Sequence, residues 1–408
     1  MSLEKLNAVL TDEVASLRAE GRTKAPERVI IDYIPPKGNK GPRYKLKGSD
    51  TEFIRMNSNS YLSLSNHPYL IEAADIATKK FGVGPGAVRF IDGTFHYHAE
   101  LEERIAQFLD KPAAKIFNSA YTSVLGMALA VTTPSTYWIG DELNHNCIIR
   151  SMRIANVPRE NKAIYKHNNM DELKQHLDNV PEGMDRVIVI FDGIFSMRGD
   201  NAPVDQIVKI VEQHTENFRD GVITVMDDSH GIGAYGMSGR GTEEFCGAKV
   251  DVLIGTFGKA FGVNGGFISA SKELIEAARQ KADTYIYTNP LSVADCAAAI
   301  KAIDIADGPE GKERLKNLQE RTHQFREAIK AIGMESIPGP HPVVPVMARD
   351  TAKTQQMVKG LYDRGILVVG LTYPVVPKGD ETIRFQINAA HTEADVDYAL
   401  KMLSEVKG

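Results

Sequence analysis

Apolar runs rich in Val, Ile and Phe alternate with amphipathic helical segments through the middle of the chain. The runs are 113–118, 136–141, 185–193, 221–228, 250–258 and 265–271, and typical helical segments are 68–82, 98–109 and 203–218. Continuous apolar strands separated by helices are typical of a parallel sheet that is buried on both faces. The pattern therefore predicts an α/β fold with a mainly parallel sheet.

The two ends of the chain have different patterns. Residues 1–22 have helical spacing, and the segment 33–50, rich in Pro, Gly and Lys, favours an arm or a short hairpin. From about residue 290 the periodicity becomes helical, and the final strands and helix indicate a small α+β unit. We expect an N-terminal helix and arm (1–52), a large α/β domain (53–290) and a small C-terminal α+β domain (291–408).

Composition narrows the class of protein. The 408 residues are 43% apolar and 25% charged with a net charge of −5, which is the balance of a soluble globular protein and does not favour a nucleic-acid partner. Three cysteines without a CxxC pair indicate neither a disulfide framework nor a cysteine zinc site. Because the chain has no continuous apolar leader and no apolar segment of membrane-spanning length, we expect a cytoplasmic protein.

Polar and small residues gather in the segments that follow the predicted strands. These segments are NSAYTS (118–123), GDELNHN (140–146), DGIFSMRG (192–199), DDSHGIGAYG (227–236) and GTFGKAFG (255–262). In open α/β sheets the functional residues lie past the carboxyl ends of the strands. Together the segments provide an amine, carboxylates, histidines and hydroxyls at one edge of the sheet, which predicts a cofactor site.

Several common kinds of site do not fit these segments. GVGPGA (82–87) follows a helical segment and contains a proline, so it does not match a dinucleotide loop. Lys259 is followed by alanine rather than Ser or Thr, which argues against a nucleoside-triphosphate loop. His96 and His98 lack a third ligand at a recognised zinc spacing, and GMSGRG (236–241) has the wrong order for a serine hydrolase.

Pyridoxal phosphate needs the groups that these segments contain. It requires a lysine for a Schiff base, a carboxylate that keeps the pyridine nitrogen protonated, and hydrogen-bond donors for its oxygens. An aspartate in VITVMDDSH and the lysine in VLIGTFGK follow consecutive predicted strands. Taken singly, the lysine is also readable as a solvated charge and the aspartate as a helix cap. Their joint order favours the cofactor.

The same motifs resemble those of the α-oxoamine synthases, pyridoxal-phosphate enzymes of fold type I that join an amino acid to an acyl-CoA. The resemblance runs through nearly the whole chain and is carried by AVRFIDGTFHYHAELE, DGIFSMRGD, DDSHGIGAYGMSGRG, GTFGKAFG and YPVVPKGDETIRFQINAAHT. VRFIDGT, YPVVPKG and IRFQINAAHT are most similar to the glycine C-acetyltransferase branch. The resemblance implies a homodimeric PLP-dependent transferase with shared active sites.

The resemblance assigns the catalytic groups to the strand ends. It implies that Lys259 is the Schiff-base lysine, that Asp227 is the partner of the pyridine nitrogen, and that His230 lies near the phenolate oxygen. Ser196 is implied to lie near the same oxygen and His145 to stack on the ring, with one of the two histidines assisting proton transfer. From the residues alone, His145 is also compatible with a hydrogen-bonded core histidine, and Ser196 with a turn residue.

The phosphate contacts follow from the resemblance as well. Ala120 and Tyr121 are implied to offer backbone N–H groups to the phosphate, as a loop that opens a helix does. Thr256 is implied to add a hydroxyl. Thr288 and Asn289 are implied to reach the phosphate from the other subunit of a dimer.

The substrate contacts carry the main departures from the family pattern. Arg384 is implied to bind the substrate carboxylate, with Asn59 close by, although Asn59 also fits a helix cap or a turn. The family's NYLGL is SYLSL here, with Ser60 and Ser63 in place of Asn and Gly, and Arg198 replaces the usual Asp after FSM. These changes leave the amino acid and the acyl chain open.

The implied reaction joins glycine to acetyl-CoA and gives 2-amino-3-oxobutyrate and free CoA. One alternative uses another amino acid or a longer acyl-CoA, with or without decarboxylation. A second alternative is a catalytically silent homologue, which would be expected to lack Lys259 or Asp227, and both are present.

Overall fold

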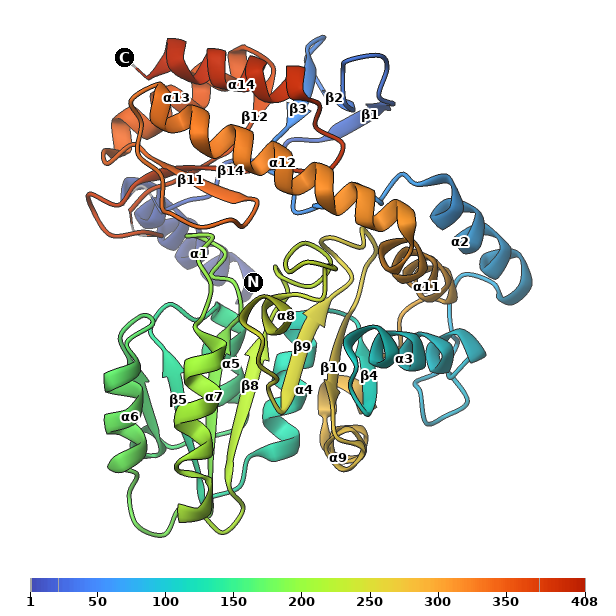
Figure 1. Cartoon of the computed structure of the whole chain (residues 1–408), viewed down its shortest axis with the longest axis vertical. Coiled ribbons are helices and arrows are strands. Elements are labelled where there is room, and N and C mark those ends of the chain that lie inside the picture. Colours follow the sequence, from blue (N-terminus) through green and yellow to red (C-terminus); the bar gives the residue numbers. More distant parts are fainter. Residues whose placement is uncertain (1, 21, 374, 408) are drawn as a thin grey trace.

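The computed structural model describes residues 2–20, 22–373 and 375–407. The described residues form two parts. A large α/β body occupies the lower part of Figure 1, and a smaller group of helices and strands, contributed by both ends of the chain, lies above it. Pro374 of the motif YPVVPKG lies outside the described residues.

The central sheet has seven strands in the order β4-β10-β9-β8-β7-β5-β6. β10 runs antiparallel to both β4 and β9, and the other neighbouring strands are parallel. The predicted α/β class with a mainly parallel sheet is confirmed. The strands are β4 (Ala113–Phe117), β5 (Thr136–Asp141), β6 (Lys162–Tyr165), β7 (Arg186–Asp192), β8 (Val222–Asp227), β9 (Val252–Thr256) and β10 (Gly266–Ala270).

Each face of this sheet packs into a different apolar cluster. Along β7, Val187, Val189 and Phe191 belong to one cluster, and Ile188 and Ile190, which point the other way, belong to the second. This two-sided burial explains why the strand is continuously apolar in sequence. The first face is covered by α3 (His96–Leu109), α6 (Met170–Asp178) and α7 (Val204–Glu212), and the second by α4 (Ala120–Val131), α5 (Asn146–Ile154) and α9 (Lys272–Lys281).

The helix expected over 203–218 is shorter than predicted. It ends at Glu212 and is followed by a short 3-10 turn, η2 (Thr215–Asn217). The His214 ring contacts the carbonyl oxygen of Ile210 at 2.7 Å, and this is the oxygen that the backbone N–H of His214 would bind if the helix continued. That N–H donates to Val211 instead, so the side chain competes with the helical pattern.

The smaller part is built from segments near both ends of the chain. The segment expected to form an arm or hairpin is an antiparallel pair, β1 (Ile30–Ile34) and β2 (Arg43–Leu46). β2 pairs with β3 (Glu52–Arg55), which runs parallel to β12 (Ile366–Leu367) of the C-terminal part. A three-stranded sheet also belongs to the smaller part, with the order β11 (Val343–Met347), β14 (Thr382–Gln386) and β13 (Val369–Leu371). The domain boundaries at residues 52 and 290 stay predictions.

The remaining helices belong to these two parts or connect them. They are α1 (Ser2–Ala19), α2 (Pro68–Phe81), η1 (Arg159–Asn161), α8 (Thr242–Cys246), α10 (Asp283–Ile286), α11 (Val293–Asp307), α12 (Pro309–Ala331), α13 (Thr351–Asp363) and α14 (Glu393–Val406). Among the described residues, no helix combines the length and the apolar character needed to cross a membrane.

Candidate active site

The loops at the carboxyl ends of β4, β5, β7, β8 and β9 meet around one cleft, as expected. Seven of the predicted site residues line it together: Ala120, Tyr121, His145, Ser196, Asp227, His230 and Lys259. Four further residues line it that the sequence reasoning did not single out: Cys147, Asp192, Ile194 and Ser229. Thr256, Thr288, Asn289, Asn59 and Arg384 lie outside this lining.

Lys259 lies in the loop that follows β9, and its amine faces two carboxylates. Burial lowers the pKa of Lys259 to about 8, although the charges of Asp227 and Asp192 oppose this change. A larger share of the amine is therefore neutral near neutral pH than for an exposed lysine. A neutral amine is the form that attacks a carbonyl or accepts a proton.

The loop around Lys259 is closed by the hydroxyl of Thr256. Its Oγ1 donates to the carbonyl oxygen of Gly265 (2.8 Å) and accepts from the backbone N–H of Gly258 (3.0 Å). Gly262 has a φ of 73°, and a Cβ there would lie 2.6 Å from a neighbouring backbone nitrogen. Only glycine fits this turn. Thr256 thus shapes the lysine loop, and the hydroxyl that it is expected to add to the cofactor site stays a prediction.

Asp227 and Asp192 occupy paired positions on the parallel strands β8 and β7. Asp227 accepts hydrogen bonds from the backbone N–H (3.1 Å) and hydroxyl (2.5 Å) of Ser229, which orient its carboxylate. Burial and the charge of Asp227 raise the pKa of Asp192 well above its usual range, although the backbone N–H of His145 donates to it at 2.7 Å. Asp192 therefore takes up a proton more readily than an exposed aspartate does.

The second aspartate of the DDSH motif has a different role. Asp228 is fully buried and accepts from the backbone N–H (2.7 Å) and hydroxyl (2.6 Å) of Thr242. A Cβ at Gly193, Gly231 or Gly241 would lie 2.1–2.3 Å from its carboxylate oxygens. Asp228 therefore holds three chain segments together, and Asp227 is the member of the pair that lines the cleft.

His230 is buried and held by two residues from distant parts of the chain. Tyr61 Oη lies 2.7 Å from His230 Nδ1. His341 Nε2 lies 3.0 Å from the His230 carbonyl oxygen, and His341 Nδ1 accepts from the backbone N–H of Val343 at 3.1 Å. His341 therefore donates through Nε2. Burial and the charge of Lys259 lower the pKa of His230 well below its usual range, which favours a neutral ring.

His145 caps the N-terminus of α5. Its Nδ1 accepts from the backbone N–H of Cys147 at 3.3 Å and lies 2.9 Å from the Cys147 thiol. Burial lowers the pKa of His145, with the charge of Asp227 opposing the change. Cys147 also points its thiol at the Asp227 carboxylate at 3.6 Å, and burial next to that carboxylate raises the pKa of the thiol. The stacking role of His145 stays a prediction.

The N-terminus of α4 has the geometry of an anion site. Ser119 caps the helix by accepting from the backbone N–H of Thr122 at 3.2 Å. Ala120 and Tyr121 are the first two helical residues, whose N–H groups have no partner within a helix. Gly266 lies against this turn, and a Cβ there would lie 2.2 Å from the backbone nitrogen of Ala120. The predicted phosphate donors are thus available at the cleft.

Thr288 and Asn289 lie beside the same end of β4. Asn118 Nδ2 donates to Thr288 Oγ1 (2.9 Å) and to the carbonyl oxygen of Asn289 (2.8 Å). Asn289 is exposed. Their predicted contact with the phosphate of another subunit stays a prediction.

Arg384 on β14 reaches the loop that contains Ser196. Its Nη1 donates to the Ser196 carbonyl oxygen at 2.8 Å, and its buried Nε has no hydrogen-bond partner among the described residues. Burial lowers the pKa of Arg384. Asn59 lies nearby, in contact with Gln386, two positions along β14. In the amide orientation that satisfies Gln386, its side-chain oxygen accepts from Arg384 Nη2 at 3.2 Å and its nitrogen donates to the carbonyl oxygen of Asn57 at 2.9 Å. A buried arginine with an unused N–H is suited to a carboxylate ligand.

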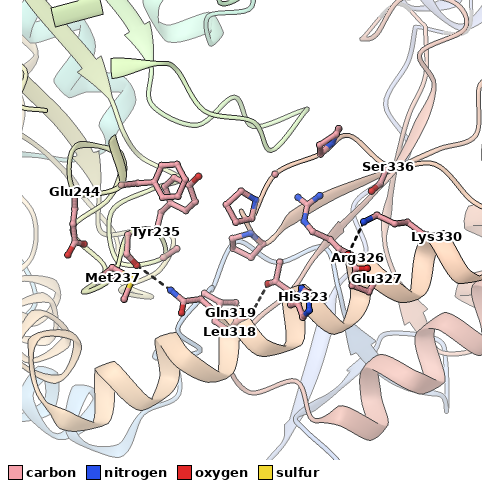
Figure 2. Close-up of a pocket in the computed structure, with 18 residues that line it drawn as sticks. Tyr235, Met237, Glu244, Leu318, Gln319, His323, Arg326, Glu327, Lys330 and Ser336 are labelled. Atoms are coloured by element: carbon pink, nitrogen blue, oxygen red, sulfur yellow. Dashed lines mark hydrogen bonds and ion pairs between the residues drawn. The ribbon is translucent and has the colours of Figure 1, made fainter. Parts of the chain in front are cut away.

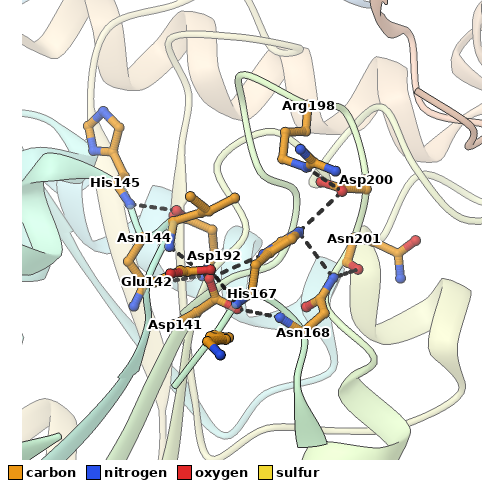
Figure 3. A network of polar contacts seen from close by, with 12 residues as sticks. Asp141, Glu142, Asn144, His145, His167, Asn168, Asp192, Arg198, Asp200 and Asn201 are labelled. Atoms are coloured by element: carbon orange, nitrogen blue, oxygen red, sulfur yellow. Dashed lines mark hydrogen bonds and ion pairs between the residues drawn. The ribbon is translucent and has the colours of Figure 1, made fainter. Parts of the chain in front are cut away.

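A polar network that the sequence did not reveal borders the cleft (Figure 3). His167 lies 3.2 Å from both Asp141 and Asp200, and Arg198 donates to Asp200 at 2.9 Å. Burial lowers the pKa of His167, but its hydrogen bonds to the two carboxylates outweigh this and raise the pKa to about 9. Arg198, one of the departures from the family pattern, is therefore partnered by a carboxylate two residues along the chain.

His98 of the HYH motif contacts backbone groups through both of its ring nitrogens. His98 is 0% exposed, and its Nδ1 accepts from the backbone N–H of Phe95 at 2.9 Å. Its Nε2 contacts the carbonyl oxygen of Leu291 at 2.8 Å. Both ring nitrogens are thus occupied by backbone groups.

The residues of the cleft fit pyridoxal phosphate. They provide a lysine with a lowered pKa, an oriented carboxylate at Asp227, and N–H groups without a helical partner at the N-terminus of α4. Beside the cleft, in contact with the Ser196 loop, lies the buried Arg384, whose Nε has no partner among the described residues. These are the groups that such a cofactor and an amino-acid substrate require. The fold and the cleft together define a PLP-dependent transferase of fold type I.

Comparison with known proteins supports this class. Residues 51–403 match the family model described as aminotransferase class I and II. A solved structure titled as SPT with a PLP internal aldimine superposes with a TM-score of 0.85 at 25% identity, covering 99% of this chain and 98% of that one. Serine palmitoyltransferase from S. paucimobilis with bound PLP-myriocin aldimine superposes with a TM-score of 0.86 at 26% identity over the same shares.

Relatives in sequence fall into two groups. The chain is 38% identical to 8-amino-7-oxononanoate synthase of Thermosipho melanesiensis over 86% of this chain and 88% of the relative. It is 34% identical to human mitochondrial 2-amino-3-ketobutyrate coenzyme A ligase over 99% of this chain and 93% of the relative. The chain belongs to the α-oxoamine synthases within the class I and II aminotransferase family, and it is a PLP-dependent enzyme.

Proposed function

We propose that this enzyme transfers an acetyl group from acetyl-CoA to glycine and forms 2-amino-3-oxobutyrate and free CoA. The observation that carries the amino-acid part is the buried Arg384, whose Nε lacks a partner beside the cleft of Lys259. The choice of glycine and acetyl-CoA is supported by the match of 99% of the chain to human 2-amino-3-ketobutyrate coenzyme A ligase and by the motifs VRFIDGT, YPVVPKG and IRFQINAAHT.

The residues of the cleft divide the work of the reaction. When bound, pyridoxal phosphate supplies an electron sink for negative charge that develops at the substrate Cα. Arg384 binds the substrate carboxylate and so fixes the direction of the Cα–H bond; its Nε–H, which has no partner among the described residues, is the donor left for this contact. Lys259 anchors the cofactor and, once free, accepts the Cα proton, because its pKa of about 8 leaves part of the amine unprotonated.

Asp227 and His230 set the electrostatics around the cofactor. Ser229 holds the Asp227 carboxylate in a fixed orientation, as its role opposite a ring nitrogen requires. Tyr61 occupies Nδ1 of His230, so Nε2 is the ring nitrogen left for a ligand oxygen. Because burial favours the neutral ring, His230 acts as a hydrogen-bond partner of fixed orientation rather than as a cation.

A longer acyl chain is the second candidate, and one feature favours it. A cavity of about 860 Å³ adjoins the cleft at Ser196, which lines both. Leu143, Phe195 and Met197 are among its apolar lining residues. This volume exceeds what an acetyl group needs, so a longer acyl-CoA, joined to glycine or to another amino acid, is the alternative pair.

The assembly is also part of the proposal. We propose a cytoplasmic homodimer in which Thr288 and Asn289 complete the phosphate site of the other subunit. Their position next to Asn118, at the end of β4 where the phosphate donors lie, supports this arrangement. Mixed dimers of Lys259→Ala and Thr288→Ala chains test this arrangement. If the sites are shared, one site of the mixed dimer combines an intact Lys259 with an intact Thr288 from the other chain, and activity is recovered.

A matrix of amino acids and acyl-CoAs tests the substrate pair. Purified holoenzyme is assayed for free-thiol release with glycine, alanine and serine against acetyl-, hexanoyl-, pimeloyl- and palmitoyl-CoA. The proposal requires the highest kcat/KM for glycine with acetyl-CoA, and a maximum at a longer chain establishes the second candidate. Lys259→Ala is the matched control, because it should lose both turnover and the visible absorption of the covalently held cofactor.

A further inference from the structure

A second cavity lies close to the catalytic centre but is separate from it. It measures about 790 Å³ and is bordered by the loop 234–245, by α12 and by the segment 336–342 (Figure 2). Concave sites of this size take small organic molecules. None of the predicted site residues lines it. Pro340 and Pro342 line it, while His341 between them reaches to the carbonyl oxygen of His230 instead.

The walls of this cavity are largely apolar. Tyr235 and Phe245 stack with their ring centroids 4.3 Å apart and form one side. Pro338, Pro340 and Pro342 lie along the segment that precedes and enters β11. Such surfaces bind flat or aliphatic groups by excluding water.

Arg326 on α12 lines the same cavity without a counter-ion. It is 7% exposed, and Figure 2 shows its guanidinium directed from the helix into the cavity. Its Nη atoms donate to the carbonyl oxygens of Ile337 (2.8 Å), His341 (2.9 Å) and Val343 (2.9 Å). Its buried Nε has no partner, and no carboxylate among the described residues forms an ion pair with it.

This arrangement differs from the other charges around it. Arg89, which is similarly buried, is paired with Glu102 at 3.1 Å. At the rim of the cavity, Lys330 is paired with Glu327 at 2.8 Å. Burial lowers the pKa of Arg326 to about 10, which reflects the cost of a charge without a partner. An anion placed in the cavity would offset that cost.

We propose that this cavity is a binding site for a small organic carboxylate, with the carboxylate on Arg326 and its apolar body against Tyr235, Phe245 and the prolines. Arg384, which contacts the Ser196 loop beside the cleft of Lys259, is likewise a buried arginine whose Nε has no partner among the described residues. The proposed site is distinct from the cleft, because no residue lines both and the two arginines contact different loops.

Calorimetric titration of the holoenzyme with 4-phenylbutanoate tests the proposal, with 4-phenylbutanamide as the uncharged match. A probe with about a dozen heavy atoms is expected to bind with a Kd on the order of 1 mM, at one site per chain. The amide should bind at least about tenfold more weakly, because it cannot form charge-assisted hydrogen bonds with Arg326. Arg326→Met should lose the binding of the carboxylate.

Three further variants locate the site. Gln319→Trp places a large ring at the exposed mouth of the cavity without touching the hydrogen bonds of Arg326, so it keeps the test decisive if Arg326→Met fails to fold. Asn317→Trp is its matched control on the exposed side of α12, and Arg384→Met removes the catalytic arginine. The proposal requires loss of binding in Gln319→Trp and retention in the other two variants. Absent saturable binding, equal affinity for the amide, or persistence in Gln319→Trp overturns it.

Discussion

Replacing His167 by glutamine removes a buried charge from the network of Figure 3 while leaving a side chain that donates hydrogen bonds. In the folded protein the pKa of His167 is about 9, against 6.5 for the free group, because its hydrogen bonds to Asp141 and Asp200 outweigh its burial. This difference corresponds to about 3 kcal/mol. This is the stabilisation that the proton on His167 contributes.

The sign of the pH dependence follows from the raised pKa. The stabilisation is complete below about pH 6.5 and is lost as the pH rises through about 9. For a chain of 408 residues, with an unfolding entropy of about 0.9 kcal/mol/K, a loss of about 3 kcal/mol lowers the Tm by about 3 °C. The variant should therefore melt about 3 °C below the wild type at pH 6 and level with it at pH 10.

Thermal melting of the wild type and His167→Gln between pH 6 and pH 10 measures this difference directly. His176→Gln serves as the control, because the ring of His176 contacts a carbonyl oxygen of Ile164 rather than a carboxylate. A difference in Tm between wild type and His167→Gln that stays constant across the range would refute the reasoning, since it would show that the two carboxylates do not hold a proton on His167.

Three further predictions concern the aspartates of the cleft, Arg384 and Ser63. Asp227→Asn should lower kcat/KM by at least about a hundredfold, because it removes the oriented carboxylate. Asp192→Asn should stay within about threefold, because burial beside Asp227 already raises the pKa of Asp192 and an amide resembles its protonated form. Equal losses in the two variants would contradict this assignment. Arg384→Lys should raise the KM for the amino-acid substrate by about tenfold or more, with a smaller effect on kcat, because lysine lacks the planar set of donors. Steady-state kinetics measure both constants, and an unchanged KM would exclude the role of Arg384 in binding the carboxylate. Ser63 has a φ of 55° and its hydroxyl accepts from the backbone N–H of Ala390 at 3.1 Å, so Ser63→Ala should melt about 1–2 °C below Ser63→Gly, which loses the same bond but relieves the backbone. Equal melting temperatures would show that the backbone at this position is not strained.

Much of the fold was predictable because local patterns determine it. The continuous apolar run of β7 requires burial on both faces, and helices on both sides of the sheet provide that burial. The end of α7 was missed, because it depends on the His214 ring reaching the carbonyl oxygen of Ile210, a competition that periodicity does not reveal.

Much of the cleft was also predictable, since Lys259 and Asp227 follow adjacent parallel strands and must meet at one edge. Asp192 carries the same signal, a carboxylate at the end of a strand, and was passed over. Asp192 differs from Asp227 in its environment. The hydroxyl of Ser229 donates a hydrogen bond to Asp227, whereas burial next to the Asp227 carboxylate raises the pKa of Asp192.

The sequence by itself determined the class of fold, the loops that carry chemistry and the kind of cofactor, because these depend on residue types at short spacing. Only the tertiary structure decided which side chains surround those loops. His341 reaches His230 across 111 residues, and Arg384 reaches Ser196 across 188. Among the residues that the structure describes, no carboxylate pairs with Arg326, and this too is a property of its surroundings. Burial and long-range contacts set these features, since the chemistry of a charged group depends on what replaces its water.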